Sequence, residues 1–175
     1  MSLQPKPDSK KYTDLILEIK KGEIKIPKFQ RNFVWSIGKT AKLLDSILKG
    51  YPIGTFILWN TNERLNDIKN IGDLELPPSL EGNKVQYILD GQQRIASLYA
   101  AFLGAKIQKE GEKKITDYKN IFVDLEKNID NDDDIVTSEK PNGLFISLHK
   151  ILNSLKYDDE IEDEFDRDYR KKIRK

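Results

Sequence analysis

Residues 85–104 read VQYILDGQQRIASLYAAFLG and predict a strand, a tight turn and a helix in succession. Residues 85–89 are rich in β-branched, aromatic and apolar types, as expected of a strand, and residues 93–103 place apolar side chains at helical spacing. Gly91 supplies the turn between them, and Gly104 ends the helix. Because glycine has no side chain, this order lets a ligand approach the backbone in front of the unpaired N–H groups that begin the helix.

Two charged side chains beside this turn indicate the chemistry of the ligand. Arg94 lies in the first turn of the predicted helix, where its planar guanidinium can clamp a phosphate that backbone N–H groups already hold. A carboxylate in the same place repels phosphate unless a cation intervenes, so we expect Asp90 to bind Mg²⁺ or to orient a water molecule. The residue types therefore predict a phosphorylated ligand together with magnesium.

Uncharged polar side chains complete the same segment. Gln92 and Gln93 offer donors and acceptors that suit the positioning of a water, a ribose or a base, and Ser97 lies one turn further on and can add a hydroxyl. The alternative is purely structural: Gly91 makes a turn, Asp90 caps the helix, and the glutamines and the arginine are solvated. The pattern alone does not decide between the two interpretations.

A second candidate segment, residues 26–35, reads IPKFQRNFVW and places polar and cationic groups between large aromatic side chains. Arg31 is suited to pairing with a phosphate, and Gln30 lies next to it. The aromatic residues of this segment are Phe29, Phe33 and Trp35. Their side chains either pack on a nucleotide base or pack into the core and hold the loop there. Aromatic residues at this spacing belong more often to a core, so Gln30 and Arg31 are the stronger candidates.

The remaining elements are predicted from periodicity and from their end signals. Helices are expected over residues 10–21, from an N-cap at Ser36 to Gly50, and over residues 147–155. Strands are expected at residues 24–26, 55–59, 121–125 and 144–148. Residues 55–59 have no polar interruption, which predicts a central strand covered on both faces, and the polar residues 60–84 predict a long loop or a small embellishment.

The composition excludes several kinds of site. The chain has 175 residues, 30 basic and 29 acidic side chains, a formal charge of +1 and no cysteine. A disulfide framework, a thiolate metal site and a general attraction to DNA or anionic membranes are therefore excluded. His149 is the sole histidine and cannot form a metal cluster or an HNH-type nuclease site. No apolar run reaches the length of a membrane span, and we expect a cytoplasmic protein.

Two tempting motifs carry no predicted function. Residues 38–40 read Gly-Lys-Thr, like the end of a phosphate-binding loop, but they lie inside the predicted helix after Ser36 and lack the earlier glycine. Residues 132–134 are consecutive aspartates without the spacing of a calcium-binding loop, and such a run is usually a solvated loop.

Three segments follow one another along the chain: IKIPKFQRNFVW at residues 24–35, LLDSILKGYPIGTF at residues 43–56 and ILDGQQRI at residues 88–95. In order and spacing they resemble the N-terminal domain family of GmrSD-type restriction endonucleases. The resemblance covers residues 12–103 with specific motifs and extends more loosely to about residue 155.

The resemblance implies an α/β (α+β) domain of the ParB/sulfiredoxin-like kind, with a small mixed sheet and flanking helices. The loop of the first motif and the turn at Gly91 would face one another across a nucleotide pocket. In this family the DGQQR motif is associated with binding and hydrolysis of nucleoside triphosphates. With the resemblance, we expect catalytic roles for Asp90 and Gln93 and a magnesium site at Asp90. The expected nucleotide-binding residues are Gln30, Arg31, Gly91, Gln92, Gln93 and Arg94, with Ser97 added from its position.

This chain differs from the related ParB proteins at the second motif. The related ParB proteins have a glycine, an acid and two arginines at the second motif, whereas this chain has Gly91, Gln92, Gln93 and Arg94. The base preference and the mechanism are therefore not transferred from ParB.

The predicted organisation has three parts. Residues 1–9 form an N-terminal extension with an expression scar, residues 10–155 form the nucleotide-binding domain, and residues 156–175 form a charged connector to a C-terminal region that is missing from the sequence. The expected partners are a nucleotide, an HNH-type nuclease domain in cis or in trans, DNA in the full-length protein, and a second copy of the chain.

The predicted function is that of a nucleoside-triphosphate-binding and hydrolysing regulatory domain in a modification-dependent restriction protein that acts in phage defence. The alternative is a non-catalytic module that binds nucleotide or DNA and positions a partner nuclease.

Overall fold

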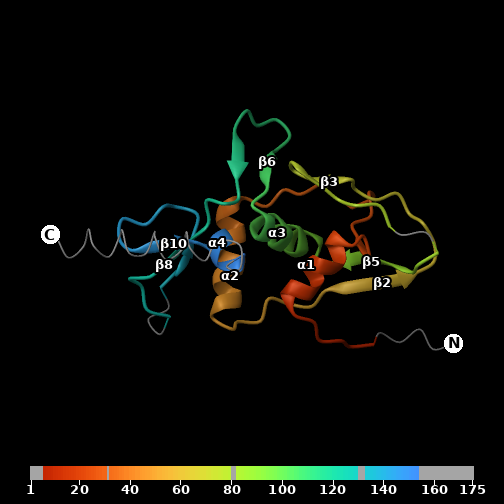
Figure 1. Ribbon diagram of the computed structural model, residues 1–175, viewed down its shortest axis with the longest axis horizontal. Coiled ribbons are helices and arrows are strands. Elements are labelled where there is room, and N and C mark those ends of the chain that lie inside the picture. Colours follow the sequence, from red (N-terminus) through yellow and green to blue (C-terminus); the bar gives the residue numbers. More distant parts are fainter. Residues whose placement is uncertain (1–5, 31, 80–81, 130–132, 154–175) are drawn as a thin grey trace.

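The computed structural model describes residues 6–30, 32–79, 82–129 and 133–153, and it has the mixed α/β architecture that the sequence predicts (Figure 1). Its helices are α1 (Tyr12–Lys20), α2 (Ile37–Leu48), α3 (Gln92–Leu103) and α4 (Leu148–Leu152). Its strands are β1 (Ile24–Lys25), β2 (Ile57–Thr61), β3 (Asn70–Ile71), β4 (Leu74–Glu75), β5 (Val85–Asp90), β6 (Lys106–Gln108), β7 (Ile115–Asp117), β8 (Phe122–Asp124), β9 (Val136–Thr137) and β10 (Phe145–Ser147).

The sheet that leads into α3 has the strand order β1-β5-β2, so β5 is its central strand. β5 pairs parallel with β1 and antiparallel with β2, and Val85, Tyr87 and Ile88 are at most 1% exposed. The prediction of a central strand at residues 55–59 is therefore wrong: β2 is an edge strand, and Ile57 is 52% exposed. An uninterrupted apolar run also occurs in an edge strand, because strand pairing rather than composition decides the position in the sheet.

Helix α3 lies at the centre of the molecule, and α1, α2 and α4 all pack against it (Figure 1). A helix surrounded in this way is apolar on nearly all sides, and Ile95, Leu98 and Ala100 of α3 are fully buried. The helix ends at Gly104, whose φ is +67°, as the sequence predicts. The position of α3 fixes the start of the helix, at Gly91, relative to the rest of the core.

Helix α2 begins as predicted, because the Ser36 side chain accepts a hydrogen bond from the Lys39 N–H at 3.2 Å. Residues 38–40 therefore lie in the first turns of a helix, in agreement with the conclusion that they form no phosphate-binding loop. Thr40 is fully buried, which removes its hydroxyl from any surface site.

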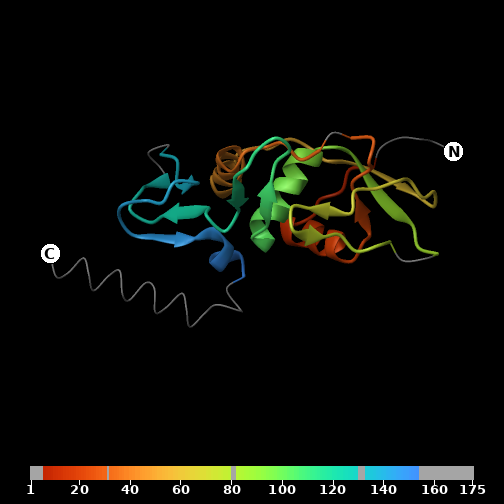
Figure 2. The same cartoon turned by 90° about the horizontal axis from the view of Figure 1, so that it is seen from above.

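A second sheet, with the order β10-β8-β9, lies at the end of the molecule opposite β2 (Figures 1 and 2). Asp45 of α2 fastens it: the carboxylate accepts hydrogen bonds from the N–H groups of Ile135 at 2.8 Å and Val136 at 2.9 Å. The Nζ of Lys49 lies 2.8 Å from the same carboxylate. Burial raises the pKa of Asp45, but Lys49 and the two N–H donors outweigh it and hold that pKa below its usual value.

Residues 60–84 contain the hairpin β3–β4, which fits the predicted embellishment, and the preceding loop carries a buried ion pair. The Nζ of Lys25, a side chain only 3% exposed, lies 3.0 Å from Asp67 and also donates to the Pro77 carbonyl. Burial raises the pKa of Asp67, whereas Lys69 and Lys25 lower it, with a net decrease. The hairpin β6–β7 follows α3 and was not predicted.

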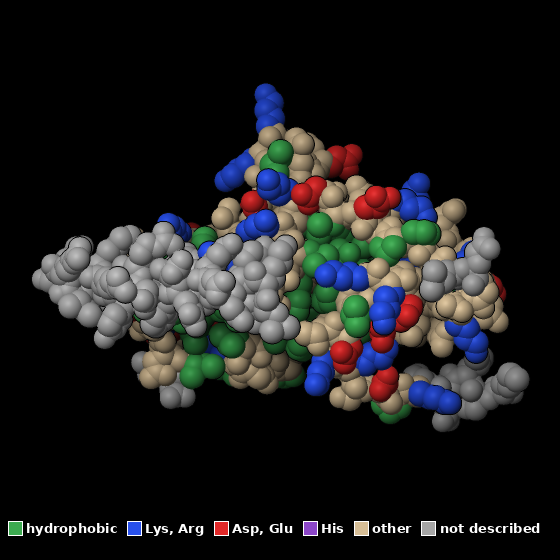
Figure 3. All heavy atoms as spheres, viewed as in Figure 1, with side chains coloured by type: hydrophobic (Ala, Val, Ile, Leu, Met, Phe, Trp, Pro, Cys, Tyr) green, Lys and Arg blue, Asp and Glu red, His purple; other side chains and the backbone are tan. Residues whose placement is uncertain are grey.

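On the face drawn in Figure 3, basic and acidic side chains are interspersed, in keeping with the formal charge of +1. Within the described residues, no helix combines the length and the apolar character that crossing a membrane requires.

Candidate functional site

The candidate site is the junction where β5 ends at Asp90 and α3 begins at Gln92. Gly91 joins them with a φ of +88°, a conformation that side chains other than glycine rarely adopt, and it is the N-cap of α3 without any side-chain capping hydrogen bond. The first N–H groups of α3 have no acceptor within the helix, as at any helix start. The predicted strand, turn and helix are thus confirmed, and the junction has the geometry that accommodates an anion.

The first motif lies directly against this junction, through two glutamines. The Gln93 side chain accepts a hydrogen bond from the Val34 N–H at 2.9 Å and donates one to the Asn32 carbonyl at 3.0 Å. In the opposite direction, the Gln30 Nε2 donates to the carbonyls of Ile88 at 2.6 Å and of Leu89 at 3.2 Å. The two motifs lie against one another as expected, and both glutamines use their amide groups to bind backbone. The nucleotide pocket expected between them stays a prediction.

A third segment, residues 53–56, also reaches the junction. The Arg94 guanidinium donates from Nη1 to the Ile53 carbonyl at 2.6 Å and from Nη2 to the Thr55 carbonyl at 2.8 Å. Its centre lies 5.0 Å from the centroid of the Phe56 ring. Residues 53–56 fall within one of the resembling segments and overlap the strand expected from residue 55, but no role at the site was predicted for them, so this contribution was missed. Gly54, which has a φ of +83°, is the residue that could have indicated a special backbone conformation there.

Asp90 remains accessible at the junction. Its side chain is 61% exposed and lies 3.1 Å from Arg94 Nη2. The alternative in which Asp90 caps α3 is wrong, because the N-cap is Gly91 and no side chain caps it. The glutamines are not solvated either: Gln92 and Gln93 are each 7% exposed.

The arrangement fits a magnesium ion only as part of a metal–nucleotide complex. Asp90 supplies one exposed carboxylate, and the described residues contain no group of three or more acidic or histidine side chains that could hold a metal. Magnesium is commonly held by one or two carboxylates, substrate phosphates and water, so one carboxylate is sufficient if phosphates supply other ligands.

Not every predicted residue reaches the junction. Ser97 is fully buried, and its hydroxyl accepts a hydrogen bond from Thr40 at 3.2 Å, because this face of α3 packs on α2. A ligand beside Gly91 therefore does not contact Ser97 in this conformation. Arg31 lies outside the described residues.

The aromatic side chains of the first motif divide into two groups. The Phe33 ring packs 6.0 Å from the Tyr118 ring, and the Trp35 carbonyl accepts a hydrogen bond from the Tyr118 hydroxyl at 3.0 Å. Burial raises the pKa of Tyr118 to about 12, so this hydroxyl stays protonated and remains a donor. Phe29, in contrast, is 70% exposed. Phe33 and Trp35 therefore fasten the loop to the core, and Phe29 is the aromatic side chain that a ligand could contact.

The sole histidine has a structural environment. His149 is 8% exposed, and its Nδ1 lies 3.0 Å from the Phe102 carbonyl. This placement agrees with the expectation that it takes no part in a catalytic relay.

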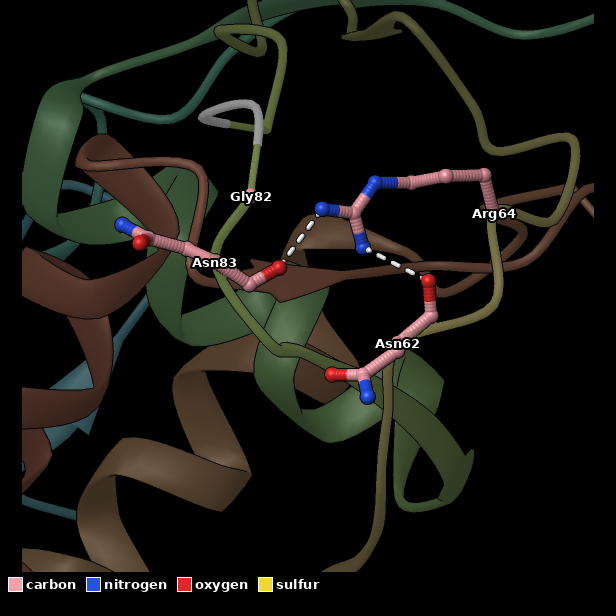
Figure 4. A pocket seen from close by; sticks show the side chains of 4 residues that line it. All are labelled: Asn62, Arg64, Gly82 and Asn83. Atoms are coloured by element: carbon pink, nitrogen blue, oxygen red, sulfur yellow. Dashed lines mark hydrogen bonds between the residues drawn. The ribbon is translucent and has the colours of Figure 1, made fainter.

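A separate hollow is lined by Asn62, Arg64, Gly82 and Asn83 (Figure 4). Arg64 Nη2 donates to the Asn83 carbonyl at 2.6 Å across it. In the β2–β5 pair, Thr61 lies opposite Val85 and Ile57 lies opposite Asp90, so this hollow is at the other end of the strands from Gly91. At about 3.4 Å per residue the two places are roughly 17 Å apart along β5. The hollow therefore does not belong to the junction.

Comparisons with known proteins identify a relative and a family. The chain is 34% identical over 131 residues to the uncharacterized protein MJ0686 of Methanocaldococcus jannaschii, a match that covers 73% of this chain and 22% of the relative. The chain therefore spans about a fifth of the length of that curated relative. No solved structure matches the chain. The family model described as the N-terminal domain of the GmrSD restriction endonuclease matches residues 12–175, and the chain belongs to that family.

Proposed function

We propose that this chain is a nucleoside-triphosphate-binding and hydrolysing regulatory domain of a modification-dependent restriction protein, with the triphosphate bound at the β5–α3 junction. The observation that supports it best is the convergence of the first motif and residues 53–56 on the start of α3, where the first N–H groups have no acceptor within the helix itself and suit phosphates. Membership in a restriction-endonuclease family supports the regulatory role.

The protein groups around the junction suggest separate roles in binding and turning over the nucleotide. The first N–H groups of α3 would bind phosphate oxygens, and the exposed ring of Phe29 would pack on the base. Asp90 would hold a magnesium ion that neutralises phosphate charge, or would orient the attacking water. Gln93 would keep the first motif in place around the nucleotide, since both ends of its amide bind backbone.

The nuclease activity of the whole protein would lie outside this chain. The buried environment of His149 does not suit nuclease chemistry, and the relative at 22% coverage is far longer than this chain. We propose that a nuclease domain, in cis or in trans, acts on phage DNA, and that nucleotide turnover here controls it.

A second function is favoured by one observation. Gln30, Gln93 and Arg94 all direct their polar groups at protein backbone, which is the arrangement expected of a module that binds nucleotide and positions a partner without hydrolysing it. Both functions predict binding, and only the first predicts turnover.

A paired assay on the 175-residue chain separates the two functions. Calorimetry with each of the four ribonucleoside triphosphates and Mg²⁺ measures binding, and release of phosphate or pyrophosphate measures hydrolysis. The hydrolysing function predicts both signals, and turnover that falls in Asp90→Asn. Binding without turnover supports the positioning module, and a chain that binds none of the four contradicts both.

A further inference from the structure

The two loops at the junction are fastened by consecutive residues of one helix. Gln93 holds the backbone of Asn32 and Val34, and Arg94 holds the backbone of Ile53 and Thr55. Successive residues of an α-helix point about 100° apart, so neighbouring side chains can bind loops on two different sides of the helix. The start of α3 is consequently enclosed from two directions.

The Arg94 side chain is largely committed to this contact. It is 17% exposed, whereas that of its partner Asp90 is 61% exposed. Its terminal nitrogens bind two carbonyls and one carboxylate, and its plane lies against the Phe56 ring. These contacts use three of the five N–H donors of the guanidinium, and a phosphate could take over the same three donors only by displacing the loop backbone and Asp90.

Two glycines allow the close approach on which this contact depends. Gly54 has a φ of +83°, and a Cβ added there would lie 2.6 Å from Arg94 Nη1. A Cβ added at Gly91 would lie 2.5 Å from Cδ1 of the Phe56 ring. Both distances are shorter than non-bonded contacts of a Cβ atom, so a side chain at either position would push the Arg94 guanidinium or the Phe56 ring out of its present contact. The positive φ of both glycines adds backbone strain to any such substitution.

We propose that residues 53–56 form a third wall of the nucleotide site and that Arg94 is a positioning residue, which holds this wall against Gly91 instead of binding the phosphate. This inference rests on the proposed nucleotide-binding function. It assigns Gly54 and Phe56 to the site through their contacts with Arg94 and Gly91.

The geometry of the guanidinium separates this role from a simple charge effect. Arginine presents several N–H donors in a rigid plane, which matches two carbonyls held by one loop, whereas lysine is a compact point charge that can still bind phosphate. Lysine at this position therefore keeps the charge and loses the two-point grip on Ile53 and Thr55.

The experiment is calorimetry of the 175-residue chain with Mg²⁺ and each of the four ribonucleoside triphosphates. We expect Arg94→Lys and Gly54→Ala each to weaken binding by about tenfold or more, the loss expected from a misplaced polar wall. Gly50→Ala is the matched control, because Gly50 has a similar φ of +71° but a Cβ there meets nothing within 4 Å. This control should bind within about threefold of the unchanged protein.

A double-mutant cycle tests whether Gly54 acts through Arg94. If it does, adding Gly54→Ala to Arg94→Ala causes no further loss of affinity, whereas independent effects would multiply. Should Gly54→Ala fail to fold, as judged by circular dichroism, Phe56→Leu replaces it: this variant adds no Cβ and removes the ring beneath the guanidinium. We expect Phe56→Leu to weaken binding by about threefold or more.

The outcomes distinguish the inference from the function on which it rests. An unchanged protein that binds no triphosphate overturns both. An unchanged protein that binds, together with Arg94→Lys of full affinity, overturns the inference alone, because charge without the planar fork would then be sufficient. Equal affinities for Gly54→Ala and Gly50→Ala, or for Phe56→Leu and the unchanged protein, also overturn it.

Discussion

The β5–α3 junction and the contact between α2 and the second sheet share one type of hydrogen bond but differ in how exposed their side chains are. In both places a polar side chain on a helix binds the backbone N–H or C=O groups of a distant segment: Gln93 binds residues 32–34, and Asp45 binds Ile135 and Val136. The attachment at Asp45 is closed, because Asp45 and its partner Lys49 are 7% and 4% exposed. The junction leaves Asp90 accessible, and Phe29 of the first motif is exposed to solvent.

This difference shows how to separate groups that stabilise the fold from groups available to a ligand. Side chains that hold backbone in a closed environment should affect unfolding, and accessible side chains beside the same contacts should affect the ligand.

Asp45→Ala should have the largest effect on stability. It leaves the Lys49 ammonium buried without its carboxylate and two N–H groups without their acceptor, which costs about 3 kcal/mol or more. Denaturant unfolding measures this loss, and the nucleotide affinity of the folded fraction should stay unchanged. A loss below about 1 kcal/mol would mean that the attachment contributes little.

Gln93→Ala should have the next largest effect, about 2 kcal/mol, because the Val34 N–H and the Asn32 carbonyl both lose their partner. Unlike Asp45→Ala, it should also weaken nucleotide binding. Gln93→Glu is the companion variant: it keeps an acceptor for Val34 but places a buried carboxylate oxygen against the Asn32 carbonyl, so it should lose at least as much stability as Gln93→Ala at neutral pH. Normal nucleotide affinity in a folded Gln93→Ala variant would remove Gln93 from the site.

Acid should destabilise the protein through Asp45 and Asp67, whose pKa values are both lowered in the folded chain. Their stabilisation is fully present above the unfolded pKa of about 3.9 and is lost as the pH falls through the lower folded values, at about 1.4 kcal/mol per unit of difference. Unfolding midpoints from pH 7 down to pH 2 measure this, and Asp45→Asn should flatten the curve. A midpoint that rises on acidification would contradict the assignment.

Asp90→Asn should have the smallest effect on unfolding, below about 1 kcal/mol, because an exposed ion pair contributes little. Its effect on turnover should be large, about tenfold or more, with a smaller change in affinity, as expected of a group that acts on the reacting phosphate. The measurements are rate, affinity and melting temperature on one variant. A normal rate would remove Asp90 from the catalytic residues.

The sequence predicted the fold best where the signal is local. The helix start at Ser36, the helix end at Gly104 and the turn at Gly91 are each specified by one or two neighbouring residues, and all three are confirmed. Strand order was not predictable, because residues 55–59 are equally apolar whether their strand is central or at an edge. Short hairpins such as β6–β7 were missed since their polar sequence carries little periodicity.

The proximity of the two motifs was predicted from the sequence, whereas their contacts were predicted only in part. The residue types of the two motifs placed the site at Gly91, but they did not reveal that Gln93 and Arg94 bind backbone, since this depends on which distant loops reach α3. Ser97 was placed at the site by its spacing from Arg94, yet the packing of α2 on that face of α3 buries it. Tertiary contacts of this kind are not encoded in local spacing.

The most direct test is a crystal structure of this chain with a non-hydrolysable nucleoside triphosphate and Mg²⁺. We expect phosphate oxygens at about 3 Å from the first N–H groups of α3, with residues 53–56 still bound to Arg94. A nucleotide bound instead in the hollow beside Arg64 and Asn83, with no ligand at the junction, would show that the β5–α3 junction is not the nucleotide site.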